Sequence, residues 1–192
     1  MASTRPVVRA ALVLAPVVIA AAVGCSSTSD GDRVESGTTS TTAVEDVVVE
    51  ADDFKPLADM TPVRDFFVDN VAGDLDATLA VANDPNGGTY PVGSVIQLVP
   101  FEAMVKRAPG FDPASNDWEF LVLDVSEDGT EIVSRGGSDV VSEFSGTACV
   151  GCHSAAEPQF DFVCEDDHGC EPLPFEDDVI RSVQESDPRP SR

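Results

Sequence analysis

The sequence has few basic residues. Lysine and arginine together number 11, against 35 aspartate and glutamate residues, and the formal net charge at pH 7 is -24. Proteins that bind nucleic acid through a basic surface need the opposite balance, so this class is excluded. The chain is 42% hydrophobic and can therefore still bury a core. Its 192 residues suit one domain with a tail or an anchor.

The apolar run near the amino terminus is too short to span a bilayer. Residues 10–24 read AALVLAPVVIAAAVG. As a helix they would be about 22 Å long, whereas the hydrocarbon of a bilayer is ~30 Å thick. Arg5 and Arg9 precede the run, and no acidic residue does. This pattern is typical of an export signal, which we assign to residues 1–24.

The signal ends in Ala22-Val23-Gly24-Cys25, which resembles a bacterial lipobox. We therefore expect Cys25 to be lipidated and to anchor the protein in the cell membrane, on the periplasmic or extracellular side. The alternative is an ordinary signal peptide that is cleaved nearby and leaves Cys25 as a free thiol. Ten of the 17 residues from 26 to 42 are serine or threonine, so residues 25–51 are predicted to be a flexible tether.

Loss of the signal removes two arginines and no acidic residue, which makes the net charge -26. A protein this acidic is repelled by anionic headgroups, so membrane contact should come from acyl chains.

Residues 52–175 are predicted to form one α+β domain with an antiparallel β-sheet and a few short helices. A helix is expected from Thr61 to Val71 and a second from Asp74 to Ala82. Strands are expected at 94–99, 118–125 and 130–133, with a turn at Asp128-Gly129. Residues 102–107 fit a strand or a helical turn, and residues 176–192 are predicted to be a flexible tail.

Cys149-Val150-Gly151-Cys152-His153 has the CxxCH pattern of covalent haem attachment. The two cysteines can form thioethers with the vinyl groups of one haem, and the histidine that follows can bind the iron as an axial ligand. The alternatives are a redox-active CxxC and a zinc site, but zinc would need more ligands and a redox motif would need a βαβ context. We therefore expect one covalent haem c, with the sheet and helices packed around it.

No methionine follows this motif, because the three in the chain are Met1, Met60 and Met104. A mono-haem electron carrier of the common type, which has its CxxCH near the amino terminus and a methionine ligand far downstream, is therefore disfavoured. His168 is the only other histidine and a candidate distal ligand, although a surface role in its acidic loop is favoured. By elimination we expect iron with an open distal face.

The five cysteines divide into three groups: Cys25 for lipid, Cys149 with Cys152 for haem, and Cys164 with Cys170. The last two flank a short loop and are expected to form a disulfide in an oxidising compartment. A metal site made of Cys164, His168 and Cys170 is the alternative.

A sheet-rich domain with a late CxxCH resembles the cytochrome P-460 and cytochrome c′-beta family. The resemblance covers about residues 90–163. It implies a five-coordinate haem c that oxidises hydroxylamine or binds nitric oxide and similar small gases. It is carried by Gly93-Ser94-Val95-Ile96, by Asn116-Asp117-Trp118-Glu119-Phe120, and by residues 149–156 with Asp161-Phe162-Val163.

This chain departs from the family at two points. Members that oxidise hydroxylamine have a strand lysine cross-linked to the haem, whereas Gln97 or Leu98 stands near that position here. Lys55 and Lys106 are the only lysines in the sequence. The Cys164–Cys170 loop is also absent from the family pattern.

The sequence thus predicts an exported, membrane-anchored mono-haem cytochrome, and an oxidoreductase activity is an open question. Its open iron site would bind or oxidise a small nitrogen species such as nitric oxide or hydroxylamine. One alternative is a six-coordinate electron carrier that serves a redox partner protein. Another is a lipoprotein without haem, in which the CxxC forms a disulfide. Glu102, Glu119 and Glu131 are candidate proton acceptors.

Overall fold

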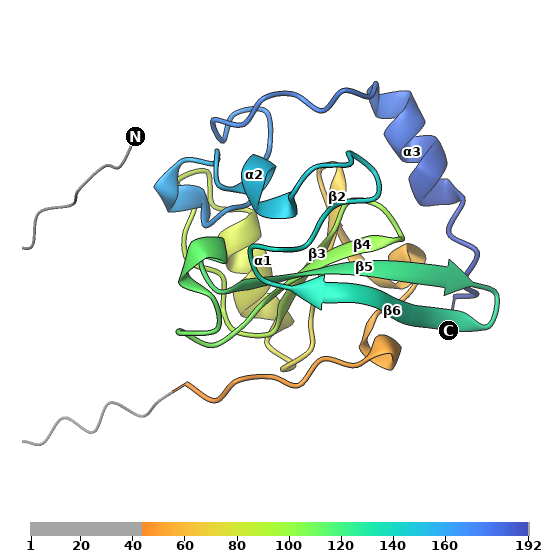
Figure 1. The fold of residues 1–192 in the computed structure, drawn as a ribbon, viewed down its shortest axis with the longest axis horizontal. Helices are drawn as coiled ribbons and strands as arrows, with labels where there is room; N and C mark the ends of the chain where they lie inside the picture. The colour runs from red at the N-terminus through yellow and green to blue at the C-terminus, as the bar shows by residue number, and fades with distance from the viewer. Residues whose placement is uncertain (1–43, 192) are drawn as a thin grey trace, which may run out of the picture. The chain divides into compact units, whose positions relative to one another are not determined.

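The computed structural model describes residues 44–191, which contain a six-stranded antiparallel sheet (Figure 1). Each strand pairs with the next one along the chain. The predicted α+β class with an antiparallel sheet is therefore confirmed. The strands are β1 (Thr61–Val63), β2 (Phe66–Asn70), β3 (Ser94–Gln97), β4 (Glu102–Lys106), β5 (Trp118–Ser126) and β6 (Gly129–Gly136). The α-helices are α1 (Leu75–Ala82), α2 (Cys149–His153) and α3 (Asp177–Glu185), and the 3-10 helices are η1 (Ala51–Asp53), η2 (Leu57–Asp59), η3 (Pro113–Ser115) and η4 (Pro158–Phe160).

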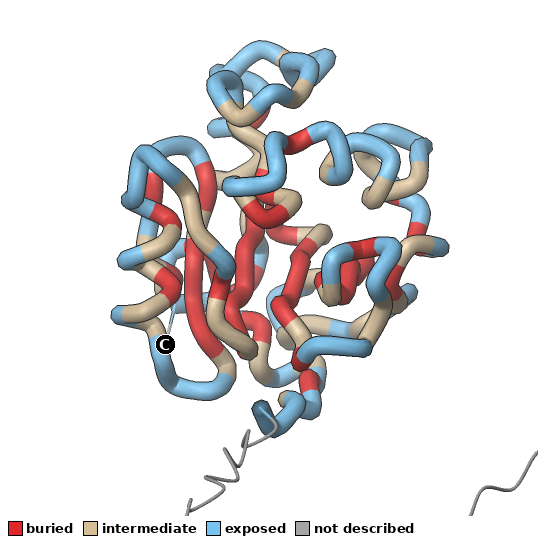
Figure 2. Tube along the Cα trace, turned by 90° about the vertical axis from the view of Figure 1, so that its left-hand side faces the viewer, coloured by how far each residue is buried: buried red, intermediate tan, exposed pale blue. Residues whose placement is uncertain are grey.

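The two faces of the sheet build two hydrophobic cores. On β5, Phe120 enters one core and Leu121 the other, as alternate residues of a strand do. Figure 2 shows buried residues along the strands and exposed residues in the loops around them. Residues of α1 and α2 pack against the first core, which contains Val63, Phe66, Val68, Ala82, Tyr90, Ile96, Met104, Trp118, Phe120, Val122, Val140 and Val163. The second core contains Val49, Phe54, Leu57, Met60, Val95, Ala103, Val105, Leu121 and Leu123.

Several predicted elements are confirmed. Helix α1 begins after Asp74, whose carboxylate accepts a hydrogen bond from the Ala77 amide at 3.4 Å, as an N-cap residue does. The strands β3 and β5 lie at the predicted places, and β5 and β6 form the predicted hairpin, whose turn is Glu127-Asp128, one residue earlier than predicted. The ambiguous segment 102–107 is the strand β4.

The prediction of a helix over residues 61–71 is wrong. These residues form the hairpin β1–β2, and Arg64 takes a positive φ of 52° at its turn. Phe66 and Val68 enter the first core, while Phe67 packs against the second. Because both faces of β2 are covered, its apolar residues do not alternate with polar ones. Such a run cannot be assigned to strand or helix by periodicity alone.

The folded domain begins earlier than predicted. Val49, placed in the tether over residues 25–51, is only 1% exposed in the second core. Asp46 accepts hydrogen bonds from the Arg107 side chain and from the Ala108 amide. The end of the predicted tether is thus part of the domain. The predicted signal peptide, Cys25 and the rest of the tether lie outside the described residues.

The segment after residue 175 also differs from the flexible tail that was predicted. It contains α3, in which Ile180 is buried. The Gln184 side chain donates hydrogen bonds to two loop carbonyls, those of Asp65 and Leu98. Arg189 is 6% exposed and forms an ion pair with Asp187. These contacts fix the segment, although its polar composition is typical of a loose tail.

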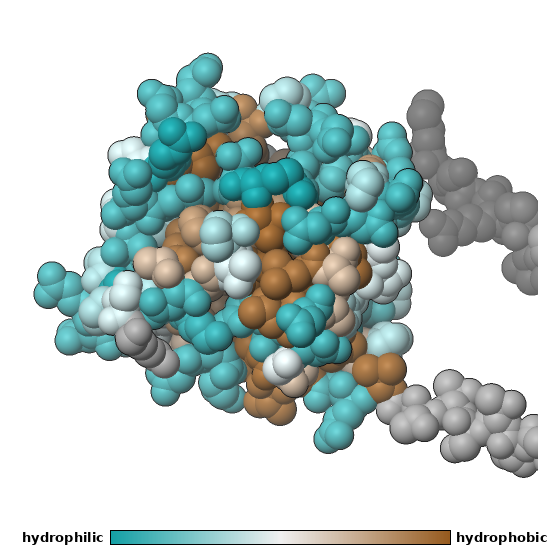
Figure 3. Space-filling model, turned by 180° about the vertical axis from the view of Figure 1, so that it is seen from behind, coloured by the Kyte–Doolittle hydropathy of each residue, from teal (hydrophilic) through white to brown (hydrophobic). Residues whose placement is uncertain are grey.

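The surface is largely hydrophilic, and Figure 3 shows one face on which hydrophobic residues gather in the middle with hydrophilic residues around them. Among residues 44–191, no helix has both the length and the apolar composition to cross a membrane. The most exposed large apolar side chains come from separate segments, namely Val44, Val48, Val133, Val141, Leu173 and Val179.

Candidate haem-binding site

The CxxCH motif forms the short helix α2, which is tied to the first core at its start. The Cys149 amide donates a hydrogen bond to the Val140 carbonyl at 3.0 Å, and Val141 and Ala148 form an isolated antiparallel bridge. The side chains of Cys149 and Val150 pack against the first core. The motif is therefore held on the face of the sheet that carries Phe120.

Cys149 and Cys152 are free thiols on the same helical turn. Cys152 is exposed, whereas Cys149 is half-buried. Burial, with a smaller effect of the nearby Glu102 charge, raises the pKa of the Cys149 thiol to about 11. A redox-active CxxC needs a cysteine whose pKa is lowered, because the thiolate is the nucleophile. The environment of Cys149 therefore disfavours the redox interpretation of the motif.

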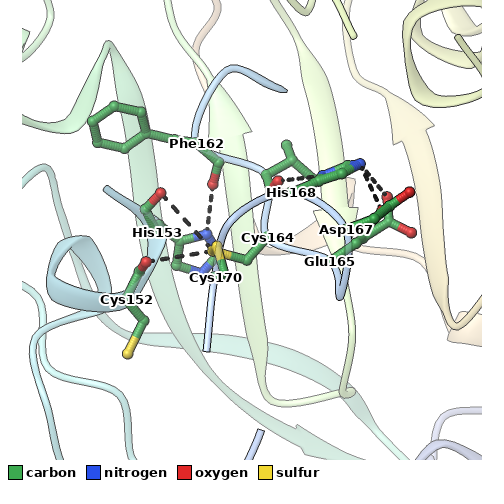
Figure 4. Close-up of a disulfide and its surroundings, with 9 residues drawn as sticks. Cys152, His153, Phe162, Cys164, Glu165, Asp167, His168 and Cys170 are labelled. Carbon is green, nitrogen blue, oxygen red and sulfur yellow. Dashed lines mark hydrogen bonds and ion pairs between the residues drawn. A yellow bond between two sulfur atoms is a disulfide. The ribbon is translucent and has the colours of Figure 1, made fainter. Parts of the chain in front are cut away.

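The side chain of His153 is oriented by the loop that follows α2. Its Nδ1 lies 2.8 Å from the Phe162 carbonyl oxygen, as the dashed line in Figure 4 shows. A carbonyl only accepts hydrogen bonds, so Nδ1 carries the proton and Nε2 keeps its lone pair. Burial lowers the pKa of His153, and its ring lies 5.0 Å from that of Phe120. A neutral imidazole with Nε2 free is the form that binds a metal.

The loop that carries Phe162 is fixed by a buried ion pair that the sequence did not reveal. Asp161 is 3% exposed, and its Oδ1 lies 2.6 Å from the Nζ of Lys106 on β4. The same oxygen accepts a hydrogen bond from the Asn116 side chain, and Oδ2 accepts one from the Tyr90 amide. Burial raises the pKa of Asp161, and the hydrogen bond and charge of Lys106 oppose this.

The predicted disulfide between Cys164 and Cys170 is present (Figure 4). Its Cys164 sulfur lies 3.4 Å from the Cys152 carbonyl oxygen. This is a packing contact, because a disulfide sulfur has no proton to donate. In the described part of the chain, no group of three or more histidine, cysteine, aspartate or glutamate side chains could hold a metal ion. The bond between Cys164 and Cys170 thus favours the predicted disulfide over a metal site made of these two cysteines and His168.

Replacing Cys164 and Cys170 together with alanine is expected to lower the free energy of unfolding by about 2 kcal/mol. The disulfide closes a short loop, with a sequence separation of six residues, and mainly restricts the unfolded chain. Urea unfolding of the oxidised protein and of this variant measures the difference. The reduced wild-type protein is the control and should match the variant. An unchanged unfolding midpoint would contradict the prediction.

His168 lies inside the disulfide loop, and its ring face and both ring nitrogens have partners. It stacks on Phe160 with ring centres 3.6 Å apart, and its Nδ1 donates to the Val163 carbonyl at 2.7 Å. Its Nε2 lies 3.6 Å from a carboxylate oxygen of Glu165 and of Asp167, toward which the ring is directed in Figure 4. These contacts would have to break before His168 could act as a distal ligand.

The three candidate proton acceptors lie in different surroundings. Glu102 accepts hydrogen bonds from the Ser142 hydroxyl and the Phe144 amide, and its charge acts on Cys149. Glu119 is 2% exposed and is bridged by the guanidinium groups of two arginines, 107 and 135. Glu131 is exposed on β6. Of the three, Glu102 is the one whose charge acts on a cysteine of the motif.

The positions aligned with the cross-linking lysine of the resembled family do not offer an amine. Gln97 is fully buried on β3, and Leu98 packs against the first core. The Nζ of Lys106 donates to Asp161 and to the Asn116 carbonyl at 2.8 Å. None of these three side chains therefore offers a free amine for a cross-link.

A protease digest of the denatured, haem-loaded protein should therefore contain haem on the peptide of Cys149 and Cys152 alone. Mass spectrometry of the haem peptides checks this. A second haem-bearing peptide that contains Lys106 would contradict it.

The chemistry of the donor set fits haem c: two unpaired thiols, three residues apart, are followed by an imidazole with an unprotonated Nε2. Two cavities lie elsewhere. One, of about 10 Å³, is lined by residues of α1, Tyr90, Phe160 and His168. The other, of about 190 Å³, lies beside η1 and Arg189.

No family model, no curated protein and no solved structure matches this chain. The functional argument therefore depends on the residues themselves.

Proposed function

We propose that the protein is a mono-haem c-type cytochrome whose iron has one open position for a small nitrogen species. The observation that carries the proposal is the hydrogen bond from His153 Nδ1 to the Phe162 carbonyl, beside the two free thiols of α2. This bond holds the imidazole in the tautomer that leaves Nε2 free for iron. The resemblance to the cytochrome P-460 and c′-beta family supports the same class.

Each residue of the site has a distinct role in this proposal. Cys149 and Cys152 hold the group covalently, and His153 is its axial ligand. Bound haem supplies an iron atom that takes up a ligand and exchanges electrons. Glu102, whose charge acts on Cys149, is the candidate acceptor for protons released during oxidation.

The proposed location is the outer side of the cell membrane, with Cys25 as the lipid anchor. The acidic composition supports contact through acyl chains alone, since the net charge is strongly negative. The partner of the site is a small ligand, and a redox protein would exchange electrons with it.

The absorption spectrum of the full-length protein, produced with haem-attachment machinery, tests the proposal. We expect a high-spin ferrous spectrum that shifts when nitric oxide or carbon monoxide is added. A low-spin spectrum that does not change when either gas is added would support the six-coordinate electron carrier instead. A protein without a Soret band would leave only the lipoprotein without haem.

A further inference from the structure

The turn that carries the Phe162 carbonyl has an unusual backbone. Asp161 and Phe162 have φ values of 51° and 66°, in the left-handed region that few residues other than glycine adopt. Two consecutive residues of this kind cost free energy and persist only where their surroundings hold them. The Phe162 carbonyl then accepts the hydrogen bond from His153 Nδ1. The orientation of His153 thus depends on whatever fixes this turn.

Asp161 is held by groups from two strands and two loops. Its carboxylate accepts hydrogen bonds from Nζ of Lys106 at 2.6 Å, from Nδ2 of Asn116 at 2.5 Å and from the amide of Tyr90 at 2.7 Å. Its own carbonyl accepts a hydrogen bond from Nε1 of Trp118 at 2.6 Å. The side chain and the main chain of this residue are therefore both anchored to the first core. Aspartate also tolerates the left-handed conformation better than most residues do.

We infer that Asp161 is a positioning residue for the iron ligand His153, and this inference rests on the proposed haem function. The buried pair of Lys106 and Asp161 fixes the turn, the turn aims the Phe162 carbonyl, and the carbonyl fixes the tautomer of His153. A hydrogen bond of this kind raises the basicity of a histidine ligand, and outer partners of a metal ligand affect metal affinity 10–100-fold in general.

A purely structural ion pair would stabilise the fold without acting on His153. Asp187 offers the matched control, because its side chain is only 8% exposed, it is paired with a cation, Arg189, and it accepts a hydrogen bond from a backbone amide, that of Leu57. Asp161→Asn and Asp187→Asn each remove one charge from such a pair and keep the size of the side chain.

The first measurement uses the full chain without haem, so it does not depend on the proposed function. Long-range nitrogen–proton NMR of His153 reports which ring nitrogen carries the proton. We expect Nδ1–H in the wild type and in Asp187→Asn, and a mixture of both tautomers in Asp161→Asn. A wild-type tautomer in Asp161→Asn would overturn the inference.

The second measurement uses the haem-loaded protein. Resonance Raman spectroscopy reports the iron–histidine stretch, which should shift to lower frequency in Asp161→Asn and stay unchanged in Asp187→Asn. Equal stretches in all three proteins would overturn the inference. If the wild type binds no haem, the proposed function fails, and the tautomer measurement alone decides the role of Asp161.

A milder variant covers the case in which Asp161→Asn does not fold. Asn116→Ala removes one of the two donors to Oδ1 and leaves the ion pair with Lys106. It should give a smaller tautomer change in the same direction. A destabilised Asn116→Ala protein with the tautomer of the wild type would show that the network is structural only.

Discussion

Replacing Cys149 and Cys152 together with alanine is expected to reduce covalently bound haem to background. In the proposed function these two sulfurs carry the thioethers, and no other free cysteine is present among the described residues. The fold should survive, because Cys152 is exposed and Cys149 is only partly buried at the edge of the first core. Haem staining of the denatured protein on a gel measures the loss, and circular dichroism checks the fold.

The matched control for this double variant is the loss of the other cysteine pair. Replacing Cys164 and Cys170 with alanine removes the disulfide that packs beside α2 and should leave covalent haem in place. Haem retained at the wild-type level without Cys149 and Cys152 would contradict the assignment of the motif.

Replacing His153 with glycine is expected to remove the proposed axial ligand while the proposed thioethers still form. The ferrous spectrum should change, and added imidazole should restore it, because the imidazole can enter the space of the missing side chain. Absorption spectra with and without imidazole measure both effects. A wild-type spectrum in His153→Gly would contradict the role of this residue.

His168→Gly is the control for this variant and also tests the six-coordinate alternative. His168 is bound to the Val163 carbonyl and stacked on Phe160, so its loss should leave the spectrum unchanged. A change from low spin to high spin in His168→Gly would show instead that His168 caps the iron.

Much of the fold could be predicted from local signals. Asp74 marks the start of α1, and Asp128-Gly129 marks the β5–β6 turn to within one residue, because both signals depend on a few neighbouring residues. Strand β2 could not be predicted, since tertiary contacts cover both of its faces. The polar segment around α3 was missed for a similar reason: distant backbone groups, including the Asp65 carbonyl, hold it in place.

The motif residues of the site could be predicted because they are adjacent in sequence, and so could the disulfide across a short loop. The hydrogen-bond network that fixes the loop beside His153 could not be predicted. Lys106 and Asp161 are 55 residues apart, and Asn116 and Tyr90 come from two further segments. In a chain with 35 acidic residues, nothing local identifies Asp161 as the partner of Lys106. The one available signal was the apolar run Ala103-Met104-Val105 directly before Lys106, since a lysine at the end of a buried strand needs an anionic partner.

The intact mass of the full-length protein, produced with haem-attachment machinery and measured under denaturing conditions, tests the central claim most directly. The account predicts a mass increased by one haem, with the increase absent from the variant that lacks Cys149 and Cys152. A mass without haem, lowered only by the two hydrogens of a new Cys149–Cys152 disulfide, would contradict it.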